Sequence, residues 1–266
     1  MIAEVAAQPN RRWHDQDLRD RGIEPSQARR WLQKHFGTTF HTYARTVRLG
    51  KAIERLHDGA PVTSVGLDHG FESLSGFGDA MKRTFGQAPT EAAKAIQITW
   101  TRITTPLGPM IAAATSDHLV LLEFADRRSF EKQCQTVCKR LGGILVPGSN
   151  EVLTSAATQI SEYFRGARRA FDVPMQTPGT DFQVSLWSEL RTIEYGTTQT
   201  YAQLADSLGR PDAVRAVGKA NGDNRIAIII PCHRVIGSDG KLTGYAGGLW
   251  RKQKLLEMES GQATLW

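Results

Sequence analysis

The most constraining feature of this 266-residue chain is a run of five apolar residues that leads into a cysteine and a histidine. The run, Ile226-Ala-Ile-Ile-Ile230, is rich in β-branched side chains, which predicts a buried strand. Pro231 follows, and a proline suits a strand end because it cannot donate to the sheet ladder. Cys232 and His233 come next, so we expect the fold to deliver a thiol and an imidazole from its core.

A thiol beside a proton acceptor is the arrangement that a nucleophile needs, since only the thiolate reacts. If the strand continues through Cys232, then Cys232 and His233 point to opposite faces. A bridging water is then the natural proton relay. A half-buried cysteine without chemistry is the alternative, and for an isolated Cys-His pair it is the commoner case. The neighbouring residues favour chemistry.

Two short helices precede this motif. The first is expected over residues 201–208, and Gly209-Arg-Pro211 ends it, since proline suits the first turn of the next helix. The second is expected over residues 212–220, so the pair predicts a helix-turn-helix. Its inward residues would be Val214 and Val217, while Arg215 and Lys219 share the other face.

The remaining residues of that second helix are small: Ala213, Ala216, Gly218 and Ala220. An ordinary helix is about 10–12 Å across, whereas the minor groove of B-DNA is about 6 Å wide. Small residues therefore favour a slim helix that approaches a widened minor groove. A plain surface helix whose alanines serve only helix propensity is the alternative.

In this setting Pro231-Cys-His-Arg-Val235 resembles the active domain of O6-alkylguanine-DNA alkyltransferases. Three further motifs carry the resemblance: Tyr201-Ala-Gln-Leu-Ala, Arg215-Ala-Val-Gly and Asn224. The fit is weaker before residue 175. The resemblance implies that the target nucleotide leaves the duplex, which costs a few kcal/mol. Cys232 would then take the alkyl group as a thioether, once per molecule.

The resemblance also assigns roles to individual residues. His233 would be the water-mediated base, Glu259 its orienter, and Asn224 the support of the active loop. Tyr201 would contact the phosphate and the flipped base, and Arg215 would fill the vacated place in the stack. The helix that carries Arg215 would present Ala216, Gly218 and Lys219 to DNA. The pocket would be lined by Pro231, Val235, Ile236, Tyr245 and Gly247.

Spacing supports Glu259 independently. Leu249, Lys252, Leu256 and Glu259 fall at i, i+3, i+7 and i+10, which predicts one inward stripe on a C-terminal helix. A buried charge needs a partner, although a solvated residue near the terminus is the alternative. Asp239-Gly240 signals a tight turn, so a hairpin or wing is expected after the cysteine; an ordinary flexible loop is the alternative.

A different module lies at the start of the chain. Two helices broken at Gly22 are expected from the apolar residues Leu18, Ile23, Ala28, Trp31, Leu32 and Phe36. Residues 62–89 resemble the distal helix-turn-helix of AraC-type regulators, and the earlier helices resemble the proximal one more loosely, with Phe40 where that family has a proline. A helix over residues 42–56 would join them. The recognition helices would present Gln27, Arg29, Arg30 and Gln33, then Ser73, Ser75 and Gly76, to phosphates, to bases or merely to solvent.

Residues 96–178 predict a small α/β domain. We expect a strand over residues 96–104, a hairpin of residues 110–115 and 119–124, and helices over residues 129–141 and 151–164. Cys134 and Cys138 lie i and i+4 on the first of these helices. Because no further ligand follows at a suitable spacing, core packing is favoured over metal binding.

The expected fold is therefore multidomain. An all-α, AraC-like tandem helix-turn-helix spans residues 11–94, a small α/β domain residues 96–178, and a mostly α, winged-helix-like alkyltransferase active domain residues 180–262. This order resembles the Ada proteins without their four-cysteine zinc domain, since no cysteine precedes Cys134.

The expected function is DNA repair by irreversible, stoichiometric transfer of an alkyl group from O6-alkylguanine to Cys232, joined to transcription regulation. Activity on O4-alkylthymine stays open. The alternative is a transcription regulator that uses the alkyltransferase domain as a methylation sensor. Expected partners are double-stranded DNA, promoter DNA and RNA polymerase, and the net charge of +6 favours nucleic acid. No cofactor, metal or membrane is expected. A reactive thiol needs a reducing compartment, which predicts the cytoplasm.

Overall fold

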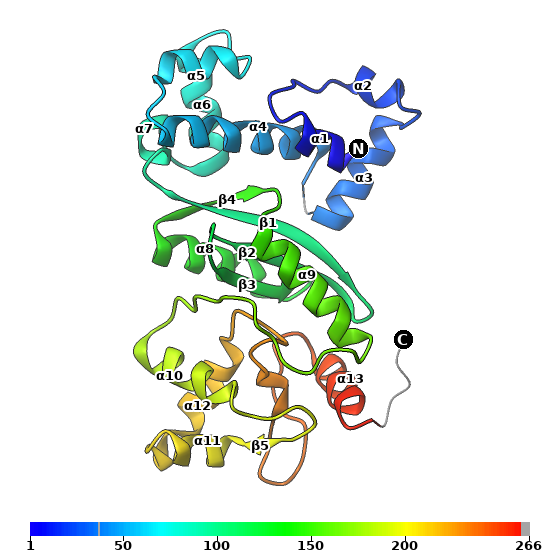
Figure 1. Ribbon diagram of the computed structural model, residues 1–266, viewed down its shortest axis with the longest axis vertical. Helices are drawn as coiled ribbons and strands as arrows, with labels where there is room; N and C mark the ends of the chain where they lie inside the picture. Colours follow the sequence, from blue (N-terminus) through cyan, green and yellow to red (C-terminus); the bar gives the residue numbers. More distant parts are fainter. Residues whose placement is uncertain (37, 262–266) are drawn as a thin grey trace. The chain divides into compact units, whose positions relative to one another are not determined.

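The computed structural model describes residues 1–36 and 38–261, and the chain divides into two compact units (Figure 1). The first unit comprises Met1–Trp100 together with Gly142–Ser149. The second comprises Thr101–Leu141 and the described residues from Asn150 onward. The predicted domain end at residue 262 lies outside the described residues.

The first unit is built from helices joined by one long connecting helix (Figure 1). Gly22 and Gly70 have φ of 70° and 74°, a left-handed conformation that glycine adopts without strain. Each glycine separates two helices, so the predicted break at Gly22 is confirmed. The helices are α1 (Ile2–Ala7), α2 (Asp15–Arg19), α3 (Pro25–Phe36), α4 (Phe40–His57), α5 (Val62–Asp68), α6 (Leu74–Phe85) and α7 (Pro89–Ala92).

Two apolar clusters hold the first unit together. Leu18, Ala28 and Leu32 pack with the start of α4, as their spacing predicts. Trp31 is 44% exposed, so its predicted place on the apolar face is wrong: it lies on the outer side of α3. The side chain of Phe36 lies outside the described residues.

A short strand that the sequence did not predict completes the second cluster. β4 (Gly143–Pro147) pairs in parallel with the first half of β1 (Ile96–Thr105). Its Ile144 and Val146 join the apolar residues of α4, α5 and α6. Gly50 of α4 approaches Val146 so closely that an added Cβ would lie 2.2 Å from a Val146 methyl carbon. The strand is thus part of the core of the helical unit.

The second unit begins with a sheet and two helices. β2 (Gly108–Ala114) and β3 (Leu119–Phe124) form an antiparallel hairpin in which Met110 faces Phe124. The strands of this unit run in the order β3-β2-β1. α8 (Phe130–Leu141) and α9 (Glu151–Phe164) agree with the predicted helices to within one residue. The side chain of Asn150 caps α9 by accepting from the amide of Leu153.

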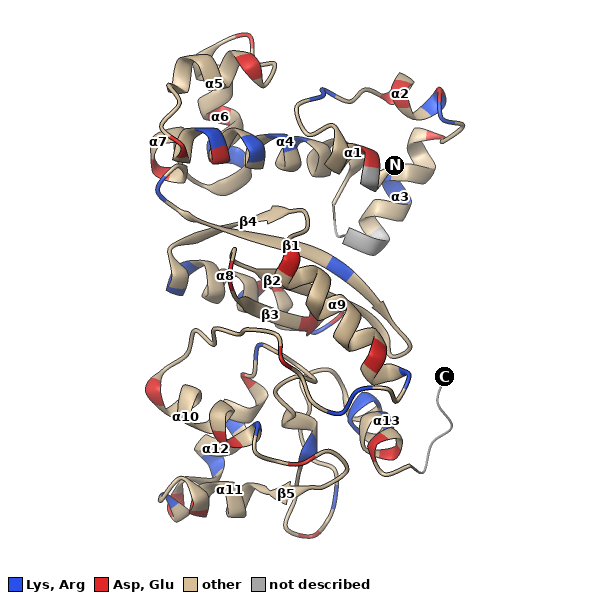
Figure 2. Cartoon of the chain, viewed as in Figure 1, with Lys and Arg blue, Asp and Glu red and all other residues tan. Residues whose placement is uncertain are grey.

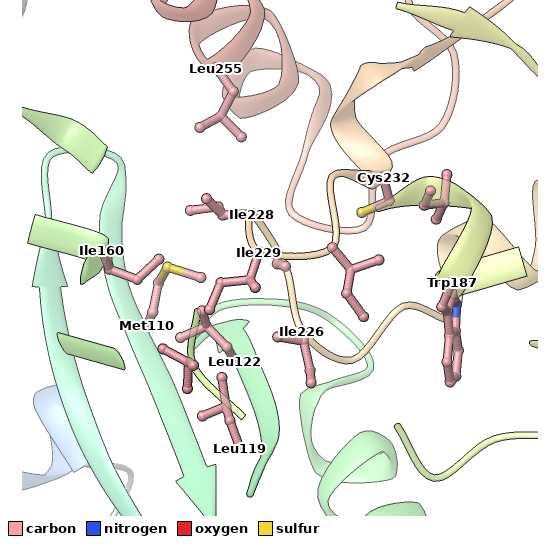
Figure 3. Packing of buried hydrophobic residues seen from close by; sticks show 14 of the residues in the cluster. Met110, Leu119, Leu122, Ile160, Trp187, Ile226, Ile228, Ile229, Cys232 and Leu255 are labelled. Atoms are coloured by element: carbon pink, nitrogen blue, oxygen red, sulfur yellow. The ribbon is translucent and has the colours of Figure 1, made fainter. Parts of the chain in front are cut away.

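The rest of the second unit is mostly helical. Its apolar core includes Leu122, Ile160, Trp187, Ile226 and Leu255, which Figure 3 shows together with Cys232. The short strands β5 and β6 pair in parallel. The elements are α10 (Asp181–Leu190), β5 (Gln199–Thr200), α11 (Tyr201–Ser207), the 3-10 turn η1 (Pro211–Ala213), α12 (Val214–Gly222), the 3-10 turn η2 (Cys232–Arg234), β6 (Val235–Ile236) and α13 (Leu249–Glu259).

The apolar run before the cysteine is buried, but the prediction of a strand is wrong. Ile226, Ala227 and Ile230 make only isolated bridges, and the chain turns back at Ile228, whose φ is 72°. Cys232 then opens a 3-10 turn instead of extending a strand. The apolar side chains of residues 226–230 are buried, as their hydrophobicity predicts, but they lie in a folded loop that packs into the core.

Three smaller predictions also need correction. Val214, the first residue of α12, is 38% exposed, while Val217 and Ala220 of this helix face the core. Leu249 is 47% exposed at the first turn of α13, while Glu259 at its other end is buried as predicted. Asp239-Gly240 forms a turn closed by the Gly237 amide and the Lys241 carbonyl, but no hairpin follows among the described residues.

Within the described ranges, no helix has both the length and the apolar content that crossing a membrane requires.

Candidate active site

Cys232 lies at the end of a tightly tied loop and is 6% exposed. Asn224, directly after α12, donates from Nδ2 to the sulfur at 3.0 Å and to the carbonyl of Ile230 at 2.9 Å. Its Oδ1 accepts from the amide of Ile226 at 3.0 Å. One side chain therefore fixes both ends of the loop and touches the thiol, which agrees with the predicted place of Asn224.

The loop itself is strained at one residue. Ile228 is β-branched and has φ 72°, a conformation that costs roughly 1–3 kcal/mol and persists only when its surroundings impose it. The surroundings here are the core and two backbone hydrogen bonds with Leu122 of β3. The Leu122 amide donates to the Arg225 carbonyl, and the Ala227 amide donates to the Leu122 carbonyl. Strain of this kind gathers at functional sites.

A buried arginine that the sequence analysis missed holds the start of the same loop. Arg127 pairs with the buried Glu123 and donates to the carbonyls of Gly222 and Asn224 at 2.6 Å and 3.0 Å. Burial raises the pKa of Glu123, and the charge of Arg127 acts in the opposite direction. Glu123 lies only four residues from Arg127, but the two carbonyls that connect Arg127 to the loop lie 95 and 97 residues away, so its role at the site had no local signal.

Glu259 is the centre of the hydrogen-bond network on the other side of the cysteine. Its carboxylate accepts from Tyr163 Oη at 2.6 Å, from His233 Nε2 at 2.9 Å and from Arg234 Nε at 2.8 Å. Burial opposes its ionisation, yet the hydrogen bond from His233, together with the hydrogen bonds and charge of Arg234, holds the pKa of Glu259 well below its ordinary value. Glu259 is thus a buried carboxylate.

His233 is fully buried, and its two ring nitrogens differ. Burial lowers the pKa of His233, although the hydrogen bond to Glu259 acts the other way, so the ring is neutral. With a carboxylate on Nε2, the proton sits on that nitrogen and Nδ1 keeps its lone pair. Nδ1 is buried and has no hydrogen-bond partner among the described residues.

The thiol is not ionised at rest. Burial raises the pKa of Cys232 to about 11, and the hydrogen bond from Asn224 only partly offsets this. No hydrogen bond joins Cys232 directly to His233 in the described structure, and the two residues are adjacent in a 3-10 turn. A base that takes the proton at the moment of reaction is therefore required.

The spacing predicted an inward Lys252 on the C-terminal helix, but no role was assigned to it. It is fully buried in α13, and its Nζ donates to the carbonyls of Val235 and Thr243 at 2.5 Å and 2.7 Å. Burial lowers the pKa of Lys252 to about 8. Its place on the same inward stripe as Glu259 was a usable signal, since an inward lysine needs partners as much as an inward glutamate does.

Tyr201 meets the glycine-rich loop that Lys252 holds. Its hydroxyl donates to the Thr243 carbonyl at 3.2 Å, so Lys252 and Tyr201 share one acceptor. Tyr245 is half-buried, and its hydroxyl has no partner among the described residues. An added Cβ on Gly247 would lie 2.8 Å from the Tyr245 ring and from Phe124, so only glycine fits there.

The remaining predicted pocket residues fall on both sides of the cysteine. Val235 is fully buried and Ile236 half-buried, and both lie in β6 directly after the η2 turn. Pro231 lines a cleft of about 370 Å³ with Ile229, Arg234 and other residues, and Cys232 is not among them.

The outer face of α12 is open to solvent. Arg215, Ala216 and Lys219 are exposed, and Gly218 is half-buried with the Tyr201 ring 3.9 Å from an added Cβ. The predicted recognition residues of α3 are likewise exposed: Gln27, Arg29, Arg30 and Gln33. Ser73 instead caps α6 by accepting from the Gly76 amide at 3.1 Å, with the Ser75 hydroxyl beside it.

Cys134 and Cys138 are half-buried on α8. Burial raises the pKa of Cys134 to about 12 and raises that of Cys138 as well, so neither is an activated thiol. Among the described residues no group of three or more His, Cys, Asp or Glu side chains could hold a metal ion.

Comparison with known protein families finds three matches along the chain. Residues 19–95 match a helix-turn-helix domain. Residues 98–177 match the ribonuclease-like domain of 6-O-methylguanine DNA methyltransferase, and residues 181–261 match its DNA-binding domain.

Individual relatives cover the later part of the chain. The methylated-DNA–protein-cysteine methyltransferase of Mycobacterium tuberculosis is 44% identical over 161 residues, which are 60% of this chain and 92% of that protein. The inducible enzyme of that name from Bacillus subtilis is 41% identical over 147 residues, 55% of this chain and 82% of that protein. A crystal structure of the Mycobacterium tuberculosis protein OGT in complex with DNA superposes with a TM-score of 0.54 at 41% identity, covering 63% of this chain and 95% of that one.

Proposed function

Because the chain belongs to the family of methylated-DNA–protein-cysteine methyltransferases, we propose that Cys232 accepts the alkyl group from O6-alkylguanine in double-stranded DNA. The observation that carries this assignment is the buried set of Cys232, neutral His233 and ionised Glu259. A thiol, a base with a free lone pair and a carboxylate that orients the base are the parts that nucleophilic catalysis needs.

The reaction follows from the protonation states. The thiol proton passes through one water to Nδ1 of His233, and Glu259 stabilises the imidazolium that forms. The thiolate attacks the alkyl carbon, so a sulfur–carbon bond forms as the carbon–O6 bond breaks. The departing guanine takes up one proton, which keeps the proton count unchanged. The product is a thioether, and because thiolate is a poor leaving group from saturated carbon, each molecule reacts once.

Access to Cys232 requires that the base leave the duplex, because the thiol is almost fully buried. We assign Arg215 on the exposed face of α12 to the vacated place in the stack, with Ala216, Gly218 and Lys219 along the groove. Tyr201 would contact the everted base, supported through Thr243 by Lys252. Asn224 would hold the loop and the sulfur in a fixed position relative to each other.

The helix-turn-helix domain adds DNA binding and regulation, as in the Ada-like fusion of an AraC-type domain with an alkyltransferase. In the part that carries Cys232, α11, α12 and the turn after β6 support a winged-helix-like classification. We place RNA polymerase among the partners of the regulatory function, and the cytoplasm as the compartment because the acceptor must stay a free thiol. Promoter binding by the full chain tests the regulatory part.

The repair proposal is tested by intact-mass spectrometry after incubation with a duplex that contains one O6-methylguanine. We expect the gain of one methyl group, mapped to the peptide that contains Cys232. The Cys232→Ser variant should gain none, whereas the matched control Cys138→Ser should gain one. Loss of the methyl group from DNA in the Cys232→Ser reaction would sink the proposal, because another group would then be the acceptor. Binding of the methylated duplex by the unchanged protein with no gain in mass would favour a regulator that only senses damage.

A further inference from the structure

A cleft in the first unit, far along the sequence from Cys232, is lined by an excess of basic side chains. It has a volume of about 730 Å³, within the range of small-molecule sites. Five arginines line it: Arg11, Arg12, Arg45, Arg48 and Arg83. Figure 2 shows basic residues along α4, which contributes two of them.

In the described part of the chain, the carboxylates that line this cleft do not pair with Arg45 or Arg48. Asp15 accepts from His41 at 2.7 Å, and Glu72 is exposed and lies 3.9 Å from Arg12. Arg45 and Arg48 form no ion pair among the described residues. Arg48 is nevertheless only 8% exposed, with its guanidinium 5.1 Å from the centre of the Phe71 ring.

Buried donors at the cleft lack acceptors. The Nε atoms of Arg45 and Arg48 and the indole Nε1 of Trp13 are buried without a hydrogen-bond partner among the described residues. Each of these groups can only donate, and leaving a buried donor unpaired is costly. Burial lowers the pKa of Arg48, and the charges of Arg12 and Arg45 lower it further. A ligand with several acceptor oxygens and negative charge would bring to this cleft the acceptors and the opposite charge that its lining residues lack.

A phosphate group has this chemistry. Its oxygens accept from guanidinium groups in strong, charge-assisted hydrogen bonds. The cleft also contains Ser73 and Gly76 at the first turn of α6, a twelve-residue helix. The Gly76 amide is already bonded to Ser73, so it is the dipole of the helix that favours an anion here. We propose that the cleft lined by Arg45, Arg48 and Trp13 is a phosphate-binding site, a function separate from alkyl transfer at Cys232.

Two sources can supply that phosphate, a free phosphorylated molecule or the backbone of DNA. The first measurement uses the full chain and titrates pyrophosphate at low salt by calorimetry. Arg48→Met removes the charge and the donors while keeping the length of the side chain, and we expect pyrophosphate affinity to fall about tenfold or more. Arg45→Gln, at a half-buried position, should also weaken binding, and it decides the question if Arg48→Met does not fold. Arg19→Gln, an exposed arginine of α2 outside the cleft, is the control with the same charge change.

The second measurement uses an undamaged duplex and records how the binding constant depends on salt. Loss of one phosphate contact lowers the slope of log K against log salt by about one. A lower slope in the Arg48 and Arg45 variants assigns the site to DNA backbone phosphate. An unchanged slope with weakened pyrophosphate binding assigns it to a free phosphorylated molecule. If both variants match Arg19→Gln in pyrophosphate affinity and in salt slope, the proposal is wrong.

Discussion

The imidazole of His233 has one ring nitrogen on a carboxylate and the other without a partner among the described residues. Under the proposed mechanism, this asymmetry leaves Nδ1 able to accept a proton before DNA binds. It also ties the stability of the fold to pH. Burial lowers the pKa of His233 in the folded protein. Below about pH 6.5 this histidine is therefore protonated in the unfolded chain but stays neutral in the folded protein.

We therefore expect the free energy of unfolding to fall as pH drops below about 6.5, with the contribution of His233 fully present above that value. Glu259 adds a second loss below its ordinary pKa, since its folded-state pKa is depressed. Denaturant unfolding at several pH values measures the slope. His233→Gln should flatten it between pH 7 and pH 5.5, while the exposed control His118→Gln should not. Equal slopes for His233→Gln and the unchanged protein would contradict the assignment.

Lys252 gives a second prediction at the scale of one side chain. Its bonds to Val235 and Thr243 hold the segment after the cysteine against the loop that meets Tyr201. Lys252→Met keeps the packing but releases both carbonyls, and a shift of about 1 Å at a reacting centre costs about 10²-fold in rate. We expect single-turnover transfer from a methylated duplex to slow by that order, with a modest loss of thermal stability because the two carbonyls lose their donor.

Lys254→Met is the matched control, two residues along the same helix and half-buried beside Glu257. It should transfer at the unchanged rate. If Lys252→Met transfers as fast as Lys254→Met, Lys252 does not position the pocket.

At the scale of elements, α12 combines an exposed arginine with small neighbours. Replacing the exposed Ala216 by Leu thickens the helix on the face assigned to the minor groove. We expect transfer from a methylated duplex to slow at least tenfold, whereas reaction with free O6-benzylguanine, which needs no groove, stays unchanged. Ala202→Leu on the exposed face of α11 is the control. Equal slowing with duplex and free base would show damage to the pocket and not a blocked groove.

The elements that the sequence predicted well are those with strong local signals. The break at Gly22, the helix over residues 151–164 and the inward Glu259 all depend on nearby residues, and the structure agrees with each. The prediction of a strand at residues 226–230 was wrong because hydrophobicity indicates burial but not the pattern of backbone hydrogen bonds. The contacts of Arg127 with the loop and the pairing of strand β4 depend on partners far away in sequence, so no local pattern revealed them.

At the scale of the molecule, the boundary between the two compact units is not a single point in the sequence after α7. Residues 142–149 belong to the helical unit, and Val146 packs on Gly50 within it. Val146 is 4% exposed, so Val146→Ala leaves a cavity. We expect a loss of about 2 kcal/mol in the stability of the first unit, with alkyl transfer by the second unit unchanged.

Calorimetric unfolding with a parallel transfer assay checks this. Val120→Ala, fully buried in β3 of the second unit, is the control and should destabilise that unit instead. If Val146→Ala slows transfer as much as Val120→Ala does, the two units are energetically coupled.

The return of residues 142–149 to the helical unit has a consequence for synthesis on the ribosome. The seven helices emerge first, but the surface of α4 around Gly50 stays uncovered until Val146 leaves the exit tunnel. By then about fifty further residues have been translated, at roughly 5–20 residues per second. The nascent chain therefore exposes this apolar surface of α4 for several seconds, and chaperones would bind it during that interval.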